Sequence, residues 1–396
     1  MNGNDIVIVS ATRTAIGKFG GQFATTSAIE LGTTVAKAAI QKANLSPEQI
    51  DTVIFGNVLQ AGLGQNPARQ VGLGAGLNHA STAVTVNEVC GSGLKAIISA
   101  AQAIRLGDSK IVLAGGTENM SLAPHLLQQR FAPKNGPVTL VDSLFNDGLT
   151  DAYSQDAMGI TAENIVEKYG FTREEQDAFA VASQQKAARA QEEGRFDNEI
   201  TPVAVFNRKI KSDDLKATDE FIRPNTTLES LAGLKPAFKK DGTVTAGNAS
   251  GINDGAACVI MTTREYATEL GLPILATLKG YAEAGVDPSM MGIGPVPAIQ
   301  KLVARTRIPL EKVDVFELNE AFAAQSMAVI KDLKIPTEKV NPFGGAIALG
   351  HPIGASGTRI VVTLINALEQ LDGKIGVASL CVGGGMGVAI AIEREK

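Results

Sequence analysis

Residues 45–58 read LSPEQIDTVIFGNV, and residues 308–321 read IPLEKVDVFELNEA. Each stretch predicts a helix, a short acidic turn and then a buried strand, and Asp51 in the first copy matches Asp314 in the second. Self-similarity at such a long distance indicates that one structural unit occurs twice in the chain. We therefore expect two pseudo-symmetric halves.

The two copies stay alike beyond these stretches. Cys90 follows Asp51 and His351 follows Asp314 at nearly equal spacing, and each is followed by a Gly/Ser turn. Apolar residues with helical spacing come next: Leu94, Ile97, Ile98, Ala101 and Ile104 in the first copy, and Ile360, Val361, Leu364, Ile365 and Leu368 in the second. Glycine-containing strands follow, KIVLAGGTEN at 110–119 and KIGVASLCVGGGMGVAIAIE at 374–393. Alternating strands and helices predict an α/β fold in layers.

The middle of the chain has a different composition. Residues 207–240 mix eight Lys and Arg with several Asp and Glu, and prolines and glycines recur. Residues 159–194 predict two helices separated at Gly170. We therefore divide the chain into an N-terminal half at 1–120 and 251–273, an inserted loop domain at 121–250, and a C-terminal half at 274–396.

The overall composition limits the class of protein. Only 19% of the 396 residues are charged, against about 25% in an average soluble protein, and the net charge of -5 gives no reason to expect nucleic acid or an anionic membrane as a partner. Three widely separated cysteines do not resemble a disulfide framework, which favours a reducing compartment. The N-terminus has no secretory signal pattern, and no stretch is apolar enough to span a membrane. We expect a cytoplasmic protein.

Three potentially reactive side chains lie in separate glycine-rich stretches. These are Cys90 in NEVCGSG, His351 in GGAIALGHPIGASG and Cys381 in SLCVGGGMG. Glycine allows a substrate to approach the backbone closely and leaves amide groups free to bind an oxyanion. Two thiols and an imidazole suit acyl transfer, in which one sulfur holds the acyl group and another group moves a proton.

Each of these residues also has a purely structural interpretation. Cys90 precedes a predicted helix, whose dipole would lower the pKa of the thiol, but most free cysteines are small core residues. A single histidine is more often structural than catalytic, although two facing half-sites would bring His351 close to Cys90. The glycines after Cys381 could form a simple turn. The polar residues of NEAFA at 319–323 could serve only as structural hydrogen-bond partners.

The remaining histidines and the remaining cysteine lie in no recognisable catalytic motif. His79, His125 and Cys258 have no supporting neighbours, and we assign them no chemistry. No metal-ligand spacing, Walker loop or dinucleotide-binding turn occurs in a convincing context, so we expect no metal site.

Taken together, the motifs resemble those of the thiolases. NEVCGSGLKAI, NEAFA, GGAIALGHPIGASG and CVGGGMG occur in the order and spacing of that family, and AGNASGINDGAA at 246–257 and MGIGPVP at 291–297 agree with it. The resemblance covers nearly the whole chain. It implies a layered αβαβα fold with two pseudo-symmetric halves, an inserted loop domain that serves coenzyme A binding and oligomerisation, and a homotetramer.

The resemblance also implies roles for individual residues. Cys90 resembles the nucleophile that becomes acylated, His351 the base that activates it, and Cys381 the group that takes the α-proton of the second acyl group. Asn319 resembles the residue that positions an oxyanion-hole water, and the N–H groups of Cys90 and Gly383 resemble a second oxyanion hole. The residues at positions of coenzyme A or acyl contact are Leu149, Met158, Arg223, Ala246, Gly247, Ser250 and Met291.

The activity implied by the resemblance is a reversible Claisen condensation of two acetyl-CoA to acetoacetyl-CoA and coenzyme A, with coenzyme A thioesters as substrates and no permanently bound cofactor. The alternative is a degradative 3-ketoacyl-CoA thiolase acting on longer chains. Ala157, where a histidine is usual, and Asn341-Pro342-Phe343, where Asn-Val-Asn is common, depart from the acetoacetyl-CoA pattern. A decarboxylating synthase, which typically uses two histidines, and a non-enzymatic acyl-carrier or lipid-binding protein fit the three reactive residues less well.

Overall fold

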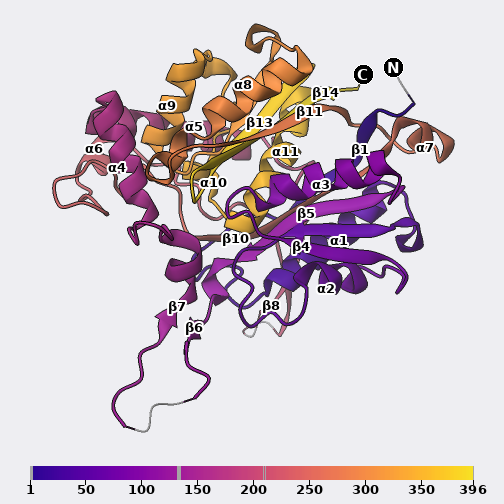
Figure 1. Cartoon of the computed structure of the whole chain (residues 1–396), viewed down its shortest axis with the longest axis horizontal. Helices are drawn as coiled ribbons and strands as arrows, with labels where there is room; N and C mark the ends of the chain where they lie inside the picture. Colours follow the sequence, from indigo (N-terminus) through magenta and orange to yellow (C-terminus); the bar gives the residue numbers. More distant parts are fainter. Residues whose placement is uncertain (1–2, 132–134, 208, 210, 396) are drawn as a thin grey trace.

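The computed structural model describes residues 3–131, 135–207, 209 and 211–395 (Figure 1). Most of its strands belong to one mixed sheet of order β12-β13-β14-β11-β1-β10-β5-β3-β4, with the short β2 paired to β10. The bounds of these strands are β1 Ile6–Arg13, β2 Gly17–Lys18, β3 Thr52–Gly56, β4 Thr82–Val86, β5 Val112–Asn119, β10 Asn253–Thr263, β11 Ala276–Gly285, β12 Val315–Leu318, β13 Ile375–Val382 and β14 Met386–Arg394.

The sheet repeats one pairing pattern on both sides of its centre. In the N-terminal half, β3 and β5 are parallel while β5–β10 and β10–β1 are antiparallel. In the C-terminal half, β12 and β13 are parallel while β13–β14 and β14–β11 are antiparallel. The two halves meet where β1 and β11 pair over only two positions. The expected pseudo-symmetry is therefore confirmed.

Asp51 and Asp314 occupy equivalent places in the two halves. The Asp51 carboxylate accepts hydrogen bonds from the backbone N–H groups of Lys110 and Ile111, at 2.7 and 2.9 Å. The Asp314 carboxylate accepts them from Lys374 and Ile375, at the same two distances. Each aspartate thus ties the loop before one parallel strand to the start of the next, which explains why the acidic residue recurs.

The expected helix before each aspartate is only a single 3-10 turn, Pro47–Gln49 in the first copy and Leu310–Lys312 in the second. Proline at or beside the start of each turn supplies no backbone donor, and the chain enters its strand directly afterwards. The sequence pattern predicted the element but overestimated its length.

Helices cover the sheet in layers. The long helices after Cys90 and His351 pack against each other and against strands of both halves, while other helices cover the outer faces. The central pair is α3 Ser92–Leu106 and α11 Ile353–Gln370. The outer helices are α1 Ala28–Lys42 and α2 Pro67–Gly74 on the N-terminal half, and α8 Pro295–Thr306 and α9 Ala323–Leu333 on the C-terminal half. This confirms the layered αβαβα expectation, and α11 is buried on all sides from Ile353 to Leu368.

The residues between β5 and β10 form the excursion expected from composition. The two predicted helices are present, and Gly170 ends the first with a left-handed φ of 68°. A thin arm carrying β6 and β7 projects away from the rest of the molecule (Figure 1). The elements of this region are β6 His125–Leu126, β7 Val141–Asp142, α4 Met158–Tyr169, α5 Arg173–Glu192, β8 Val203–Asn207, β9 Ser212–Lys216 and α6 Leu228–Ala232.

Two short helices complete the fold, α7 Arg264–Glu269 after β10 and α10 Ala346–Leu349 before His351. Within the described ranges, no helix combines the length and the apolar character that crossing a membrane requires.

Candidate active site

A cavity of about 480 Å³ lies between the two halves and the inserted region. Cys90 and His351 both line it, as the facing half-sites predicted. Most of its wall is apolar, with five phenylalanines and three methionines. A concave, mainly apolar pocket with a few polar groups is typical of a small-molecule site.

Cys90 lies in a tight turn directly before α3. The preceding residue, Val89, has φ of +47°, which is unusual for a β-branched residue. The hydroxyl of Ser92 holds this turn, because it donates to the Val89 carbonyl at 2.6 Å and accepts from the Glu88 N–H at 2.8 Å. A strained backbone held by specific bonds is common beside reactive groups, and here it presents Cys90 to the cavity.

The pKa of Cys90 departs from the expectation of a lowered value. Burial in the cavity wall raises it to about 11, and the Glu118 carboxylate adds to this, although the N–H groups of Gly383 and of Cys90 itself act in the opposite direction. The helix terminus is too weak to overcome the desolvation of a thiolate. The expected lowering of the Cys90 pKa is therefore wrong, and the resting protein holds a neutral thiol that needs a base.

His351 is built as such a base. Its Nδ1 lies 2.6 Å from the Ser356 hydroxyl, which itself donates to the Pro352 carbonyl at 2.9 Å. In the arrangement in which the hydroxyl donates to that carbonyl, Nδ1 carries the imidazole proton and Nε2 is left as an acceptor. Nε2 is buried and has no protein partner among the described residues. Burial, with the nearby Arg359 charge, lowers the pKa of His351 to about 3, so the ring is neutral.

Cys381 is the penultimate residue of β13 and is not part of the cavity lining. It is fully buried and packs in an apolar cluster with Met291 and Phe322. Burial raises its pKa, and the proximity of Cys90 raises it further. Gly383 follows in the turn to β14, where a Cβ atom would lie 3.5 Å from the Met158 sulfur and 3.3 Å from Val89. The backbone N–H group of Gly383 donates a hydrogen bond to the Cys90 sulfur, which lowers the pKa of that thiol. The structure thus brings Cys90, Cys381 and Gly383 together.

The two polar residues of the NEAFA motif, Asn319 and Glu320, differ in whether their side chains have hydrogen-bond partners. This difference distinguishes a structural role from a functional one. Glu320 is a structural hydrogen-bond partner, since its carboxylate accepts from Ser183 Oγ, Asn341 Nδ2 and the Ile347 N–H. Asn319 is equally buried, yet neither of its side-chain polar atoms has a partner among the described residues. An unpaired buried amide is costly unless it serves a ligand or a water. This favours a functional role for Asn319 alone.

The residues expected to contact coenzyme A are placed as follows. The cavity lining includes Leu149, Met158, Arg223, Ala246, Ser250 and Met291. Gly247 is not part of the lining: it lies behind it, where a Cβ atom would come within 2.6 Å of Leu231 and Leu234.

Sequence reasoning missed three features of this site. Phe19, Phe145, Phe221, Phe238 and Phe322 form much of the wall. No sequence pattern predicted these phenylalanines as cavity residues, because they come from five separate segments of the chain. Ser356 lay inside a quoted motif without an assigned part. Glu118 accepts hydrogen bonds from Asn57 Nδ2 and the N–H groups of Val58, Leu59 and Gly354, and so joins the two halves beneath Cys90.

Comparison with known proteins agrees with this arrangement. The thiolase N-terminal domain matches residues 6–265, and the thiolase C-terminal domain matches residues 272–394. An acetyl-CoA acetyltransferase of Cupriavidus necator is 57% identical over 99% of this chain and 100% of its own length. A probable acetyl-CoA acyltransferase of Staphylococcus aureus is 55% identical over 99% of both chains.

Solved structures also resemble this chain over its whole length. The Bacillus anthracis acetyl-CoA acetyltransferase has a TM-score of 0.96 at 45% identity and covers 99% of both chains. Human mitochondrial 3-ketoacyl-CoA thiolase has a TM-score of 0.96 at 42% identity over 100% of both chains. Both thiolase domains match this chain, and Cys90 and His351 line one cavity, so the chain belongs to the thiolase family.

Proposed function

We propose that this protein is an acetyl-CoA C-acetyltransferase, which condenses two acetyl-CoA reversibly to acetoacetyl-CoA and coenzyme A. The observation that carries the proposal is that Cys90, a neutral thiol, and His351, whose Nε2 has no partner among the described residues, line the same apolar cavity. The relatives named acetyl-CoA acetyltransferase support the choice of substrate.

In the first half-reaction, His351 Nε2 takes the proton from Cys90, and the sulfur attacks the carbonyl carbon of acetyl-CoA. The carbonyl oxygen becomes an oxyanion, which the unpaired polar groups near the site would stabilise; one such donor contributes about 2.7–4 kcal/mol. The C–S bond to coenzyme A breaks, and its sulfur receives the proton from His351. Acetyl-Cys90 remains, and the acyl group keeps its thioester reactivity.

In the second half-reaction, the Cys381 thiol gives its proton to the neutral His351, and the resulting thiolate takes the α-proton of another acetyl-CoA. The resulting enolate carbon attacks the carbonyl of acetyl-Cys90, and the bond from that carbonyl to the Cys90 sulfur breaks. The protonated His351 gives its proton to the Cys90 sulfur, Cys381 keeps the α-proton as its thiol hydrogen, and acetoacetyl-CoA is released with all three groups in their resting state. The cycle needs no permanently bound cofactor, because its reactants are coenzyme A thioesters.

The cavity wall supports a preference for short acyl groups. Met291 belongs to the same apolar cluster as Cys381, Met158 packs against that cluster, and both methionines line the cavity. Methionine is flexible, so slightly longer 3-ketoacyl-CoAs would still enter. Each additional methylene typically changes discrimination by about 1–3 kcal/mol, so activity should fall steeply beyond a few carbons.

The degradative 3-ketoacyl-CoA thiolase is the second candidate. One observation favours it: Ala157 lines the cavity with a small side chain in place of the histidine usual in acetoacetyl-CoA enzymes. Kinetics with acetoacetyl-CoA and longer 3-ketoacyl-CoAs separate the two, because kcat/KM that rises steadily toward long chains would favour the degradative enzyme.

We further propose a cytoplasmic homotetramer in which residues 121–250 serve coenzyme A binding and assembly. The edge strand β4 exposes Val84, and the arm of β6 and β7 exposes Phe131, Val138 and Leu140. Exposed apolar residues on an edge strand and a projecting arm are characteristic of protein interfaces. Sedimentation equilibrium of the purified protein tests the subunit number.

The direct test of the proposed chemistry is to map the acetyl group. After incubation with acetyl-CoA and digestion, mass spectrometry should find acetylation at Cys90. The buried Cys258 provides an internal control, because it lies outside the cavity. Acetyl on Cys381 or Cys258 with Cys90 unmodified would contradict the proposal.

A further inference from the structure

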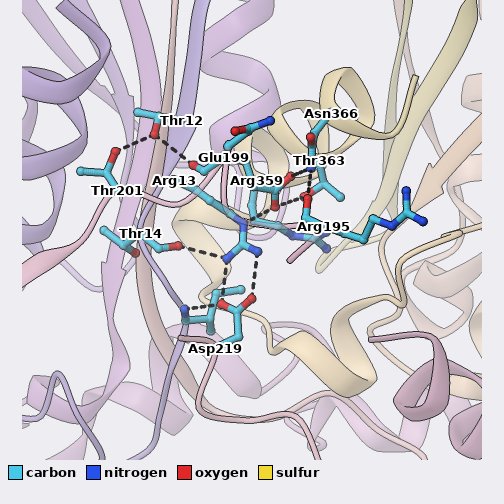
Figure 2. Close-up of polar contacts among 12 residues, drawn as sticks. Thr12, Arg13, Thr14, Arg195, Glu199, Thr201, Asp219, Arg359, Thr363 and Asn366 are labelled. Atoms are coloured by element: carbon cyan, nitrogen blue, oxygen red, sulfur yellow. Dashed lines mark hydrogen bonds and ion pairs between the residues drawn. The ribbon is translucent and has the colours of Figure 1, made fainter. Parts of the chain in front are cut away.

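Arg13, at the end of β1, is a fully buried arginine held between two acids from distant parts of the chain (Figure 2). Its Nε donates to Glu199 at 2.5 Å. Its Nη1 and Nη2 donate in parallel to the two carboxylate oxygens of Asp219, at 2.7 and 2.8 Å. This two-pronged geometry is specific to arginine, because a lysine ammonium cannot reproduce it.

Asp219 ties an irregular segment of the insertion to the N-terminal half. The same carboxylate accepts a hydrogen bond from the Ile16 N–H at 2.8 Å, and the next residue, Glu220, donates its N–H to the Ile16 carbonyl at 3.0 Å. The Glu220 carboxylate accepts from the N–H groups of Lys18 and Gln22. Residues 217–227 contain no helix or strand, so the place of the segment depends on these bonds and on the one from the Arg223 N–H to Gln184 Oε1 at 2.8 Å.

The segment continues directly into the cavity wall. Phe221 and Arg223 both line the cavity, and the Arg223 guanidinium lies over the Phe221 ring at 5.1 Å. Phe221 also packs on Gly251, where a Cβ atom would come within 2.4 Å of the ring. Among the residues that the structure describes, no carboxylate forms an ion pair with Arg223. Its charge is therefore available to an anionic ligand.

The other partner of Arg13 connects to the helix that begins after His351. Glu199 accepts hydrogen bonds from Thr363 Oγ1 at 3.1 Å and from Asn366 Nδ2 at 2.8 Å, and both residues belong to α11 (Figure 2). Arg13 thus links the cavity-wall segment on one side and the catalytic helix on the other. Removing one partner of a buried ion pair leaves an uncompensated charge, so breaking this link is costly.

We propose that the Arg13–Asp219 pair is a positioning device for acyl-CoA binding, which fixes residues 219–223 so that Phe221 and Arg223 form a preordered wall for the coenzyme A portion of the substrate. The proposal rests on the proposed function, since it deepens the account of how that substrate is held. Neither residue of the pair lines the cavity, so each acts through the segment rather than on the substrate.

The test is Asp219→Asn, which keeps the size of the side chain but places an amide donor against the guanidinium. Thiolysis is measured with acetoacetyl-CoA and with acetoacetyl-N-acetylcysteamine, which lacks the nucleotide and most of the pantetheine. Loss of preorganisation should raise KM for acetoacetyl-CoA and Kd for free coenzyme A about tenfold or more, with kcat nearly unchanged. The short thioester should retain its kcat/KM within about twofold.

Thr363→Val is the matched control, because it removes one hydrogen bond from the same buried network without touching the segment. It should leave the Kd of coenzyme A unchanged. Should Asp219→Asn fail to fold, Glu220→Ala replaces it: Glu220 is partly exposed and anchors the same segment. That variant should raise Kd and KM in the same direction by a smaller factor.

Three results would overturn the proposal. The first is a coenzyme A affinity that stays at the wild-type value in both Asp219→Asn and Glu220→Ala. The second is a Thr363→Val variant that binds coenzyme A as weakly as Asp219→Asn does. The third is an equal loss of kcat/KM for both thioester substrates in Asp219→Asn, which would indicate general disruption. If the wild-type protein itself binds no coenzyme A in calorimetry, the proposed function is wrong and this inference falls with it.

Discussion

The hydroxyl of Ser356 lies 2.6 Å from Nδ1 of His351, and while it donates to the Pro352 carbonyl it accepts the Nδ1 hydrogen, which leaves Nε2 as the basic nitrogen. Both residues lie around the first turn of α11, and His351 is held from behind by the bond from its N–H to Asn253 Oδ1 at 2.9 Å. A base held in one orientation and one tautomer is ready to accept a proton in a larger fraction of the molecules, which favours general base catalysis.

Ser356→Ala should therefore lower kcat while changing KM little. Without the hydroxyl the imidazole can adopt the other tautomer or rotate, and we expect a loss of about tenfold or more, within the range of general base effects. The matched control is Ser379→Ala, which removes a buried hydroxyl that donates to the Val388 carbonyl. Equal losses in both variants would show that Ser356 has only a structural role.

The raised pKa of Cys90, about 11, predicts how its reactivity changes with pH. In the free protein, the thiolate fraction and hence the rate of alkylation by iodoacetamide should increase about tenfold for each pH unit from 7 to 10. A model thiol with an ordinary pKa near 8.5 should instead level off above about pH 9. The measurement is mass-spectrometric quantification of alkylated Cys90. A plateau below pH 8 would mean that the thiol is activated before substrate binds.

Cys381→Ser should separate the two half-reactions. A hydroxyl is a far poorer proton acceptor than a thiolate, so condensation should fall by about 10²–10⁴-fold or more while acetylation of Cys90 continues. Single-turnover acetylation and steady-state condensation measure the two steps independently. Cys258→Ser is the control, since Cys258 is buried away from the cavity. Parallel loss of both steps would contradict a proton-transfer role.

Arg223→Ala should raise KM for acetoacetyl-CoA and leave kcat nearly unchanged. Arg223 lines the part of the cavity formed by the inserted region, and we expect it to bind the substrate equally well in the ground state and in the transition state. Lys235→Ala removes the same charge from an exposed position outside the cavity lining and should have no effect. The contrast is sharpest at low ionic strength, where screening is weak. An unchanged KM for the Arg223 variant under those conditions would argue against the contact.

Much of this molecule follows from local sequence patterns. The repeat around Asp51 and Asp314 predicted two equivalent halves, because a recurring acidic turn makes the same backbone bonds in both. The apolar period after Cys90 and His351 predicted α3 and α11, and Gly170 predicted a helix end. These features depend on neighbours in the chain, and so they can be read from the sequence.

What the sequence could not decide depends on contacts between distant segments. Burial reversed the expected pKa shift of Cys90, since desolvation is set by the surrounding walls and not by the residues next to it. Only the tertiary structure separated Glu320, whose carboxylate is satisfied, from Asn319, whose amide is not. It alone brought Arg13 between Glu199 and Asp219, because a buried charge is stable only where folding supplies its partners.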